Sequence, residues 1–543
     1  MIVPLTRRAA MRLLAALPAV LSARGAAGQA RTGAGPDDWR SHLRLGAPGP
    51  FDFERLTARA EALAAAPHVE APVAHADLLE SIDYAAYQGI RYRADASLWR
   101  DEPGLFPAQL FFPGRYFKQK VAIHVVEGGA ARTVPFDRGL FEFDDPALAG
   151  RLPDDLGFAG FRLHGADGRP NDWLAFLGAS YFRSAGAEDQ YGMSARGIAV
   201  DTAMSDGEEF PRFTDFWLEQ DPADRHRAVI CALLDGPSLA GAYRFDCRFD
   251  ADEAARTGHG PVMHVTARLF LRRPMARLGV APLTSMYWFS ETNRHRATDW
   301  RPEIHDTDGL ALWTGAGERI WRPLNNPSVV RTSVFVDDNP RGFGLLQRDR
   351  AFHNYEDDGV YYNRRPGVWI EPDGAWGPGA VMLLEIPTDD EIHDNIGAFW
   401  VPAEPIRAGG RRDFAYWLHW TASDPYPAPD VGRVVHTRLG RAGVPGEPRP
   451  GDGIKFVVDF ADGPIAGLGQ RYDVEVVVDT SRGRIVEPYA LQVVGTPAWR
   501  AVFDLHLDPE APGGDPVELR CFLRLDGRAL TETWLFQHEP FAF

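Results

Sequence analysis

The sequence is short of cysteine, has no excess of basic residues and contains no long apolar stretch. Its three cysteines show no Cys-x-x-Cys or His-x-x-x-His spacing, so nothing indicates a zinc site. Acidic residues outnumber basic ones by 75 to 58, and the resulting net charge of −17 argues against a nucleic-acid partner. No segment approaches the roughly 20 apolar residues of a membrane-spanning helix. A zinc protein, a nucleic-acid-binding protein and a helical membrane protein are therefore disfavoured, and we expect no metal and no cofactor.

The residues that are abundant favour a turn-rich β protein. A chain of 543 residues is long enough for about two to four domains, because a single core stops growing near 250–300 residues. Hydrophobic residues make up 45% of the chain, which is enough to build large cores. Aromatic residues at 11%, together with 54 Gly and 43 Pro, favour β architecture over helical bundles.

Residues 1–30 resemble an export signal. Arg7 and Arg8 lie in a near twin-arginine pattern, and the apolar run from Leu13 to Ala23 is too short to span a bilayer. Small residues follow, with a cleavage site expected after Ala30. The alternative is an amphipathic first helix, which Pro18 would interrupt. We therefore predict a twin-arginine signal peptide, which would export an already folded protein.

The three cysteines allow at most one internal disulfide. Cys231 and Cys247 flank a hairpin signal, Asp235-Gly-Pro-Ser238, so the two thiols could face each other across paired strands. Cys521 lies in an alternating run, Val517–Leu525, whose odd positions are apolar, which predicts a buried thiol.

Helical patterns are confined to the first part of the chain. Phe51–Ala65 is expected to be a helix with Asp52 as its N-cap, and Asp77–Tyr87 is a second helical candidate. Beyond about residue 110, short aromatic or β-branched runs alternate with Gly, Pro, Asn and Asp, as in a large antiparallel sandwich. We assign residues 31–402 to this N-terminal domain.

A Pro- and Gly-rich linker at 403–410 precedes a second domain, residues 411–543. About seven strand-like runs separated by turns indicate an immunoglobulin-like sandwich. The runs are Phe414–Ala422, Val431–Arg438, Ile454–Phe460, Val474–Asp479, Ile485–Val494, Ala501–Leu507 and Val517–Leu525. Few polar clusters occur here, so we expect a support or interaction domain. The predicted fold class is thus all-β, with two sandwiches.

Polar residues that could carry chemistry are concentrated at 284–400. Carboxylates are interleaved there with Trp, Tyr, Arg and Asn, the residue types that contact sugar rings and hydroxyls. Cleavage of a glycosidic bond needs one carboxylic acid and one carboxylate. The alternative is that these acids cap turns and pair with surface arginines, and that Trp313, Trp321 and Trp400 are core residues.

Seven motifs in the chain resemble the periplasmic glucan biosynthesis proteins G and D, the OpgG/OpgD (MdoG/MdoD) family. The motifs are Leu233–Phe245, Pro282–Phe289, His305–Leu310, Trp313–Arg319, Arg322–Pro327, Phe343–Gln347 and Asp394–Trp400. The resemblance runs from about residue 50 to the C-terminus, and the twin-arginine signal is more similar to the D branch.

The resemblance implies a galactose-mutarotase-like N-terminal sandwich and an immunoglobulin-like C-terminal one. It implies a periplasmic enzyme of osmoregulated periplasmic glucan biosynthesis, acting on linear or cyclic β-1,2-glucan. The activity would be that of an anomer-inverting endo-β-1,2-glucanase or a transglycosylase. The alternatives are a non-catalytic glucan-binding scaffold that assists a membrane glucosyltransferase, and a generic lectin. A homodimer is a candidate assembly.

The resemblance also implies site roles. Asp394 would be the general acid, with Asp389 and Asp390 as alternatives, and Asp306 would be the general base. Tyr362 is a candidate for a proton relay from the base to its water. We expect Asp306 in a hydrogen-bonded, partly wet setting, and Asp394 in a drier one that raises its pKa. The substrate-binding candidates are Trp288, Arg294, Trp313, Arg319, Tyr361, Asn363, Asp308, Asp390 and Trp400.

Overall fold

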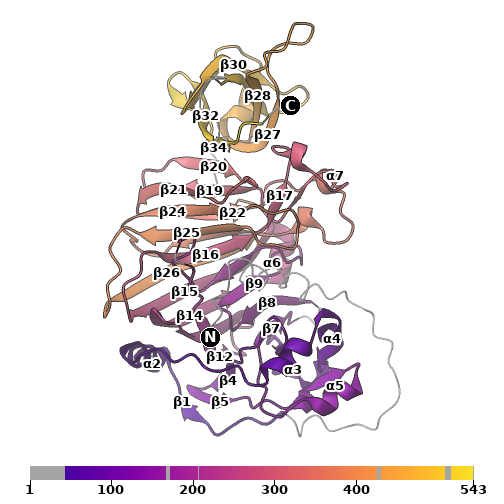
Figure 1. Ribbon diagram of the computed structural model, residues 1–543, viewed down its shortest axis with the longest axis vertical. Coiled ribbons are helices and arrows are strands. Elements are labelled where there is room, and N and C mark those ends of the chain that lie inside the picture. The colour runs from indigo at the N-terminus through magenta and orange to yellow at the C-terminus, as the bar shows by residue number, and fades with distance from the viewer. Residues whose placement is uncertain (1–42, 167–170, 206, 425–429, 508–514, 542–543) are drawn as a thin grey trace.

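The computed structural model describes residues 43–166, 171–205, 207–424, 430–507 and 515–541 (Figure 1). The predicted signal peptide, residues 1–30, lies outside these ranges. The described chain is nearly all β, which confirms the expected fold class. None of its described helices is long and apolar enough to cross a bilayer.

Two large sheets form the main body. The strands of the longer sheet are, in spatial order, β1 (Gly49–Pro50), β5 (Ala130–Thr133), β4 (Ala122–Glu127), β12 (Arg212–Gln220), β13 (Arg227–Asp235), β14 (Leu239–Arg248), β15 (His259–Leu271), β26 (Arg411–Thr421), β23 (Gly367–Pro372), β22 (Gly342–Leu346), β19 (Gly309–Trp313), β20 (Arg319–Pro323), β34 (Thr533–His538), β32 (Val517–Leu525) and β29 (Glu475–Thr480). The second sheet consists of β21 (Arg331–Asp338), β24 (Pro378–Glu385), β25 (Ile396–Pro402), β16 (Leu278–Ser285), β10 (Ser194–Arg196), β9 (Tyr181–Ser184), β8 (Asp172–Leu177), β7 (Gly160–His164) and β3 (Ala108–Phe111).

Aromatic side chains fill the space between the two sheets. Phe161 and Phe176 of the second sheet pack edge-on against Phe216 of β12, and Phe176 also packs against Phe245 of β14. These rings are buried in one continuous cluster that includes side chains of both sheets. The alternation of inward apolar residues along the strands therefore produces the predicted sandwich.

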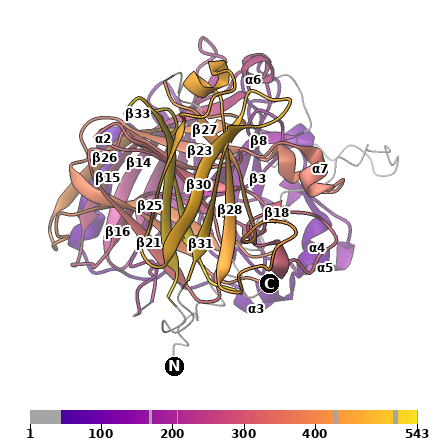
Figure 2. The same ribbon diagram turned by 90° about the horizontal axis from the view of Figure 1, so that it is seen from above.

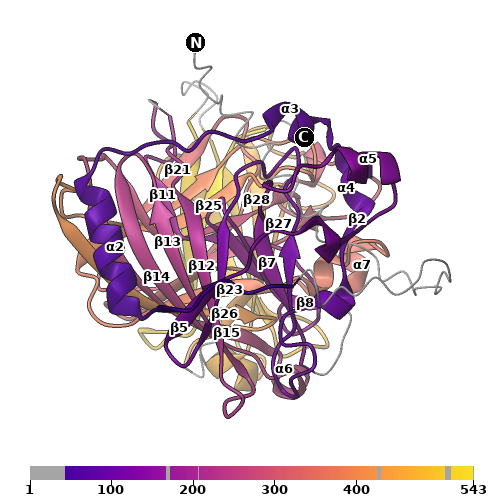
Figure 3. The ribbon, with the colours of Figure 1, turned by 90° about the horizontal axis from the view of Figure 1, so that it is seen from below.

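Helices cover the edges and the outer face of this body. The first expected helix is confirmed as α2 (Phe53–Ala65), whose N-cap Asp52 accepts the backbone N–H of Arg55 at 2.8 Å. The other helices are α3 (Ala76–Ser81), α4 (Tyr84–Gln88), α5 (Pro146–Arg151), α6 (Ala251–Thr257) and α7 (Phe352–Tyr355). Figure 3 shows α2 lying across β13 and β14, where Leu56 and Ala60 are buried.

The second expected helix, Asp77–Tyr87, is interrupted. It forms α3 and α4, because the Asp83 carboxylate accepts the Ala86 N–H and starts a new helix there. Two short β pairs complete this part of the chain, β2 (Ile90–Tyr92) with β6 (Phe141–Phe143) and β17 (Tyr287–Phe289) with β18 (Ile304–His305).

The C-terminal unit is a smaller sandwich at one end of the long axis (Figure 1). One layer is β27 (Arg433–Arg441), β28 (Gly453–Ala461), β31 (Trp499–His506) and β30 (Arg484–Gln492). The other is formed by β29, β32 and β34, and Phe456, Phe503 and Trp534 lie in the core between the layers. Figure 2, viewed onto this end, shows β28, β30 and β31 in front of the main body.

The boundary between the two units differs from the expectation. Strand β26, expected to open the second domain, pairs with β15 and β23 inside the large sheet. The final strand β34, which the sequence reading did not include, pairs in parallel with β20, Ile320 being opposite Thr533. The two sandwiches therefore share one continuous sheet, and residues 403–410 do not separate them.

The possible disulfide is absent among the described cysteines, all of which are free and buried. Cys231 is opposite Arg244, whereas Cys247 is opposite Ala228, three positions along β13. An odd offset puts the two thiols on opposite faces of the sheet. Cys231 packs on the outer face under α2 and Cys247 in the core between the sheets. The burial of Cys521 is as predicted.

Candidate functional site

The loops that carry the two predicted catalytic acids are joined at the start of the β17–β18 hairpin. The backbone N–H of Asp306 donates to Met286 O at 2.8 Å. The side-chain amide of Asn395 accepts from Tyr287 N at 2.8 Å and donates to Tyr287 O at 2.9 Å. The adjacent residues Met286 and Tyr287 therefore hold the segments of both acids. Met286 binds Asp306, which follows β18, and Tyr287 binds Asn395, the neighbour of Asp394 before β25.

Asp306 is buried and ion-paired. Its residue is 1% exposed, and its carboxylate accepts a hydrogen bond from the Arg365 guanidinium. The expectation of a hydrogen-bonded carboxylate is met, but the expectation of a partly wet one is wrong. Arg365 takes the place of water here because a charge-assisted bond compensates for the lost hydration.

Asp394 lies near Asp306 and near two arginines. Burial raises its pKa to about 7, the negative charge of Asp306 adds to the rise, and Arg183 and Arg365 oppose it. The raised pKa agrees with the expectation, although at 9% exposed Asp394 is not the drier of the two acids. A carboxyl with this pKa is protonated in a large fraction of molecules near neutral pH.

Tyr362 belongs to the same cluster. It opens the 3-10 turn η5 (Tyr362–Arg364), and the Arg365 guanidinium lies 4.1 Å from the centre of its ring. Its hydroxyl donates to Glu391 Oε2 at 2.5 Å, and Arg301 binds both carboxylate oxygens of Glu391 at 3.0 and 3.1 Å. Burial raises the pKa of Tyr362 well above its ordinary value, so the phenol keeps its proton.

A glutamine fixes the tyrosine relative to the acid-bearing strand. The Gln347 side chain donates to His305 O at 3.1 Å and to Tyr362 O at 3.2 Å. Its Oε1 contacts the imidazole of His305 at 3.0 Å, and that residue is fully buried. This framework holds the segment before Asp306 and the turn of Tyr362 at a constant separation.

Three further candidates lie on neighbouring turns. Tyr361 is 36% exposed, and the guanidinium of Arg364 lies 5.7 Å from the centre of its ring. Asn363 belongs to η5, and its buried Oδ1 has no hydrogen-bond partner among the described residues. Asp390 is half-buried and accepts the Ile392 N–H. Tyr361 and Asn363 flank Tyr362 in the chain, and Asp390 directly precedes Glu391.

Asp308 has a structural environment. Its carboxylate accepts the backbone N–H groups of Arg348 at 3.0 Å and Asp349 at 2.8 Å. Burial raises its pKa to about 6. It therefore caps the turn after β22, as the alternative interpretation of these acids expected.

Two tryptophans in the predicted set have packing roles. Trp400 is fully buried beside Trp376 in the core, so it cannot stack on a ligand, and its assignment is corrected. Trp313 carries the guanidinium of Arg319 at 3.5 Å from its ring centre, and the ring packs against the C-terminal core. Trp313 and Arg319 are thus a cation–π pair at the end of the β19–β20 hairpin.

Trp288 belongs to β17, and Arg294 opens the 3-10 turn η4 (Arg294–Arg296) that follows it. Trp288 packs on the buried cluster that contains Tyr362, and its carbonyl accepts from Asn326 at 3.0 Å. Arg294 is exposed and lines a cavity of about 240 Å³ together with Glu291 and Glu303. Burial raises the pKa of both glutamates to about 8, and the two carboxyls are hydrogen-bonded to each other.

The sequence reading missed four residues of the cluster. Arg365 lies two positions after Asn363, within the polar stretch 284–400, so its place in that stretch was the available signal. Glu391 and Arg301 also lie within the stretch 284–400, but the ion pair between them joins residues 90 positions apart and is not visible in the sequence. Arg183 comes from β9 and gives no sequence signal, because it is a lone charge in an apolar strand. Within the described ranges, no group of three or more His, Cys, Asp or Glu side chains is arranged to hold a metal ion.

The fold and this cluster define a class: an all-β protein of two fused sandwiches with a buried acid–arginine site on loops of the larger one. The family model described as "Periplasmic glucan biosynthesis protein, MdoG" matches residues 51–538. The chain therefore belongs to the MdoG family of periplasmic glucan biosynthesis proteins, as its motifs indicated.

Curated relatives match over nearly the whole chain. Glucans biosynthesis protein D 2 of Ralstonia nicotianae is 50% identical over 514 residues, covering 92% of this chain and 93% of that protein. Glucans biosynthesis protein D of Stenotrophomonas maltophilia is 48% identical, covering 92% and 91%. The protein of the same name from Xanthomonas oryzae pv. oryzae is 46% identical, covering 92% of each chain.

Proposed function

We propose that the chain is a periplasmic enzyme that cleaves or transfers β-1,2-linked glucan by an anomer-inverting mechanism. The observation that supports this most is the unequal pair of acids. Asp306 has its own arginine partner, whereas Asp394 has a pKa raised to about 7. Two acids in one cluster with different electrostatic partners are suited to base and acid roles.

In the proposed reaction, Asp394 donates its proton to the glycosidic oxygen as the bond from that oxygen to the anomeric carbon breaks. A water molecule attacks the same carbon from the opposite face, and its proton passes to Asp306. An inverting pair needs room for that water, about 6.5–9.5 Å between carboxyls. Return of the proton from Asp306 to Asp394 through solvent restores the starting state. If a sugar hydroxyl replaces the water, the same steps give transfer.

Tyr362 would connect the base to the water. Its hydroxyl already donates to Glu391, and its ring stacks on the guanidinium that binds Asp306. A phenol that stays protonated can accept one proton while passing on another, so it can take part in a hydroxyl relay without changing charge.

The remaining parts of the proposal concern substrate and setting. Tyr361, Asn363, Asp390, Trp288 and Arg294 are the candidates for glucan contact. The relatives' names support glucan as the substrate class. Export by the twin-arginine route, cooperation with a membrane glucosyltransferase and homodimer formation are further proposals.

The test is to incubate the purified mature protein with linear β-1,2-glucan and to resolve the products by size. Shorter products, with the newly formed anomer inverted when followed by NMR, would support hydrolysis, and longer or cyclic products would support transfer. An α-1,4-glucan of similar length is the control substrate. Unchanged β-1,2-glucan that nevertheless binds the protein would overturn catalysis in favour of a binding scaffold.

A further inference from the structure

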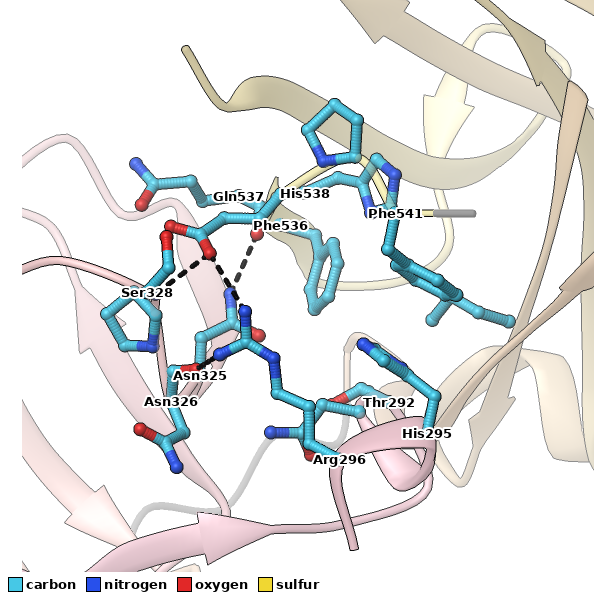
Figure 4. Close-up of a pocket in the computed structure, with 15 residues that line it drawn as sticks. Thr292, His295, Arg296, Asn325, Asn326, Ser328, Phe536, Gln537, His538 and Phe541 are labelled. Atoms are coloured by element: carbon cyan, nitrogen blue, oxygen red, sulfur yellow. Dashed lines mark hydrogen bonds and ion pairs between the residues drawn. The ribbon is translucent and has the colours of Figure 1, made fainter. Parts of the chain in front are cut away.

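A second cavity, of about 400 Å³, lies at the seam between the main body and the C-terminal end of the chain. We call it the seam cavity. It is lined by Thr292, Asn293, His295, Arg296, Asn325–Ser328, Leu439 and Phe536–Phe541. Figure 4 shows the labelled side chains converging on it from two directions, Thr292, His295 and Arg296 from one segment and Phe536, His538 and Phe541 from the other. Its lining contains none of the residues of the Asp306–Asp394 cluster.

The walls of the seam cavity are tied together. The Glu539 carboxylate accepts from Arg296 at 3.4 Å and from the backbone N–H of Ser328 at 3.0 Å. The Asn325 side-chain amide donates to the backbone oxygen of Gln537 at 2.7 Å. The opening is therefore held by contacts between segments more than 200 residues apart, as in a preformed ligand site.

The charges around the seam cavity favour a neutral ligand. Arg296 and Glu539, the charged side chains of its lining, pair with each other. Burial lowers the pKa of His538 to about 4, and burial together with Arg296 lowers that of His295. Both imidazoles are therefore neutral near pH 7. A phosphate or carboxylate ligand would find no uncompensated positive charge here.

The remaining lining combines flat rings with amides. His295 and Phe541 stack with ring centres 3.8 Å apart and planes 14° apart, and Phe536 adds a third ring. Nε2 of His538, a residue 2% exposed, has no hydrogen-bond partner among the described residues. A buried ring nitrogen without a partner is unfavourable, and a ligand hydroxyl is one group that can supply the missing bond. Flat apolar rings beside neutral amide and imidazole groups match a sugar, which has apolar C–H faces and a rim of hydroxyls.

We propose that the seam cavity binds a short segment of neutral oligosaccharide, separately from the Asp306–Asp394 cluster. Its specific assignment to β-1,2-glucan rests on the proposed function. A site of this kind would hold a distant part of the same chain, or a second chain, while the cluster acts on its target bond.

The experiment uses the full mature protein carrying Asp394→Asn, so that turnover does not consume the probe. Linear β-1,2-glucooligosaccharides are titrated by calorimetry, with maltooligosaccharides and inorganic phosphate as comparison probes. His295→Ala and Phe541→Ala are added separately, because His295 is exposed and Phe541 lies near the chain end, so both variants should fold. Tyr472→Ala, a ring 91% exposed and outside the lining, is the matched control.

We expect two classes of oligosaccharide site, one of which is weakened at least tenfold by His295→Ala and by Phe541→Ala but not by Tyr472→Ala. Crystals soaked with the oligosaccharide should show it in the seam cavity. One class of site, equal binding by all three variants, or binding of phosphate instead would overturn the inference. Seam binding in a wild-type protein that leaves β-1,2-glucan uncleaved would support the inference while refuting the proposed catalysis.

Discussion

Two pairs of acids lie close to the β17–β18 hairpin, and their surroundings differ. Asp306 is ion-paired with Arg365, while Asp394 faces that charge pair with a pKa of about 7. The carboxyls of Glu291 and Glu303 are hydrogen-bonded to each other, and burial raises the pKa of both to about 8. Glu291 also accepts the Thr437 N–H at 3.1 Å, across the seam to β27.

The difference shows that a raised pKa does not by itself mark a catalytic acid. In the glutamate pair both members are shifted in the same direction, so neither is prepared to act as a base while the other acts as an acid. In the aspartate pair, Arg365 forms an ion pair with Asp306 only, so Asp306 is suited to the role of base and Asp394 to that of acid. We therefore expect chemistry at the aspartates and a structural role for the glutamates.

The sharpest test of this comparison is Asp394→Asn, set against Glu303→Gln. The amide keeps the shape of Asp394 but has no proton to donate, so the rate on β-1,2-glucan should fall by about 10²–10⁴-fold or more. Binding of the glucan should be retained. Glu303→Gln should keep most of the wild-type rate. Steady-state product formation decides, and a near-wild-type rate for Asp394→Asn would remove it from the acid role.

The next effect is on stability and concerns Arg365→Gln. Without the guanidinium, the carboxylate of Asp306 is left buried without its counter-charge, which typically costs about 3–5 kcal/mol in the free energy of unfolding. Its exposed neighbour provides the control, since Arg364→Gln should change stability by less than about 0.5 kcal/mol. Urea unfolding measures both. Equal stabilities would mean that Arg365 does not support Asp306 in solution.

A smaller loss of rate is expected for Tyr362→Phe. The variant keeps the ring that stacks on Arg365 but loses the hydroxyl that donates to Glu391. A hydrogen bond to a charged group contributes about 1.5–3 kcal/mol, so a relay through this hydroxyl predicts a decrease in kcat of about 10–100-fold. Tyr489→Phe, an exposed ring on β30 outside the candidate site, is the matched control and should change kcat little. If KM rises and kcat is unchanged, Tyr362 contacts substrate rather than relaying a proton.

Local patterns in the sequence were sufficient for the fold class and for the capped helix α2. The apolar alternation of the strands and the position of Asp52 depend on neighbours a few residues away. They were not sufficient for the sheet membership of β26, because its alternation is the same whether it pairs with β15 or opens a new domain. The partner of a strand is decided by tertiary packing, and the apolar alternation within the strand does not specify it.

The candidate site divides in the same way. Asp306, Asp394 and Tyr362 came from motifs, and the structure brings Asp306 close enough to interact electrostatically with both Asp394 and Tyr362. The assignment of Trp400 to sugar binding was wrong because the sequence does not show whether a tryptophan is buried in the core or exposed to a ligand. Arg183 had no signal at all, since only the packing of β9 brings it near Asp394.

The smallest expected effect is a change in the pH dependence of stability, and it tests the structural role of the glutamate pair. An unfolded glutamate has a pKa of about 4.3, whereas Glu291 in the folded protein has one of about 8, so the folded state binds the extra proton between these values. The free energy of unfolding contributed by this group therefore falls as pH rises from about 4.3 to about 8. Glu291→Gln keeps an oxygen for the Thr437 N–H and removes the titration.

The variant should accordingly match the wild type in melting temperature at pH 5 and exceed it by a few degrees at pH 9. Glu61→Gln, an exposed change on α2, is the control and should follow the wild type at both pH values. The decline of the glucan-cleaving rate above about pH 7 should be unchanged in Glu291→Gln, because Asp394 governs it. A shift of that decline together with the melting curve would mean that the two acid pairs titrate as one system, and the distinction between them would fail.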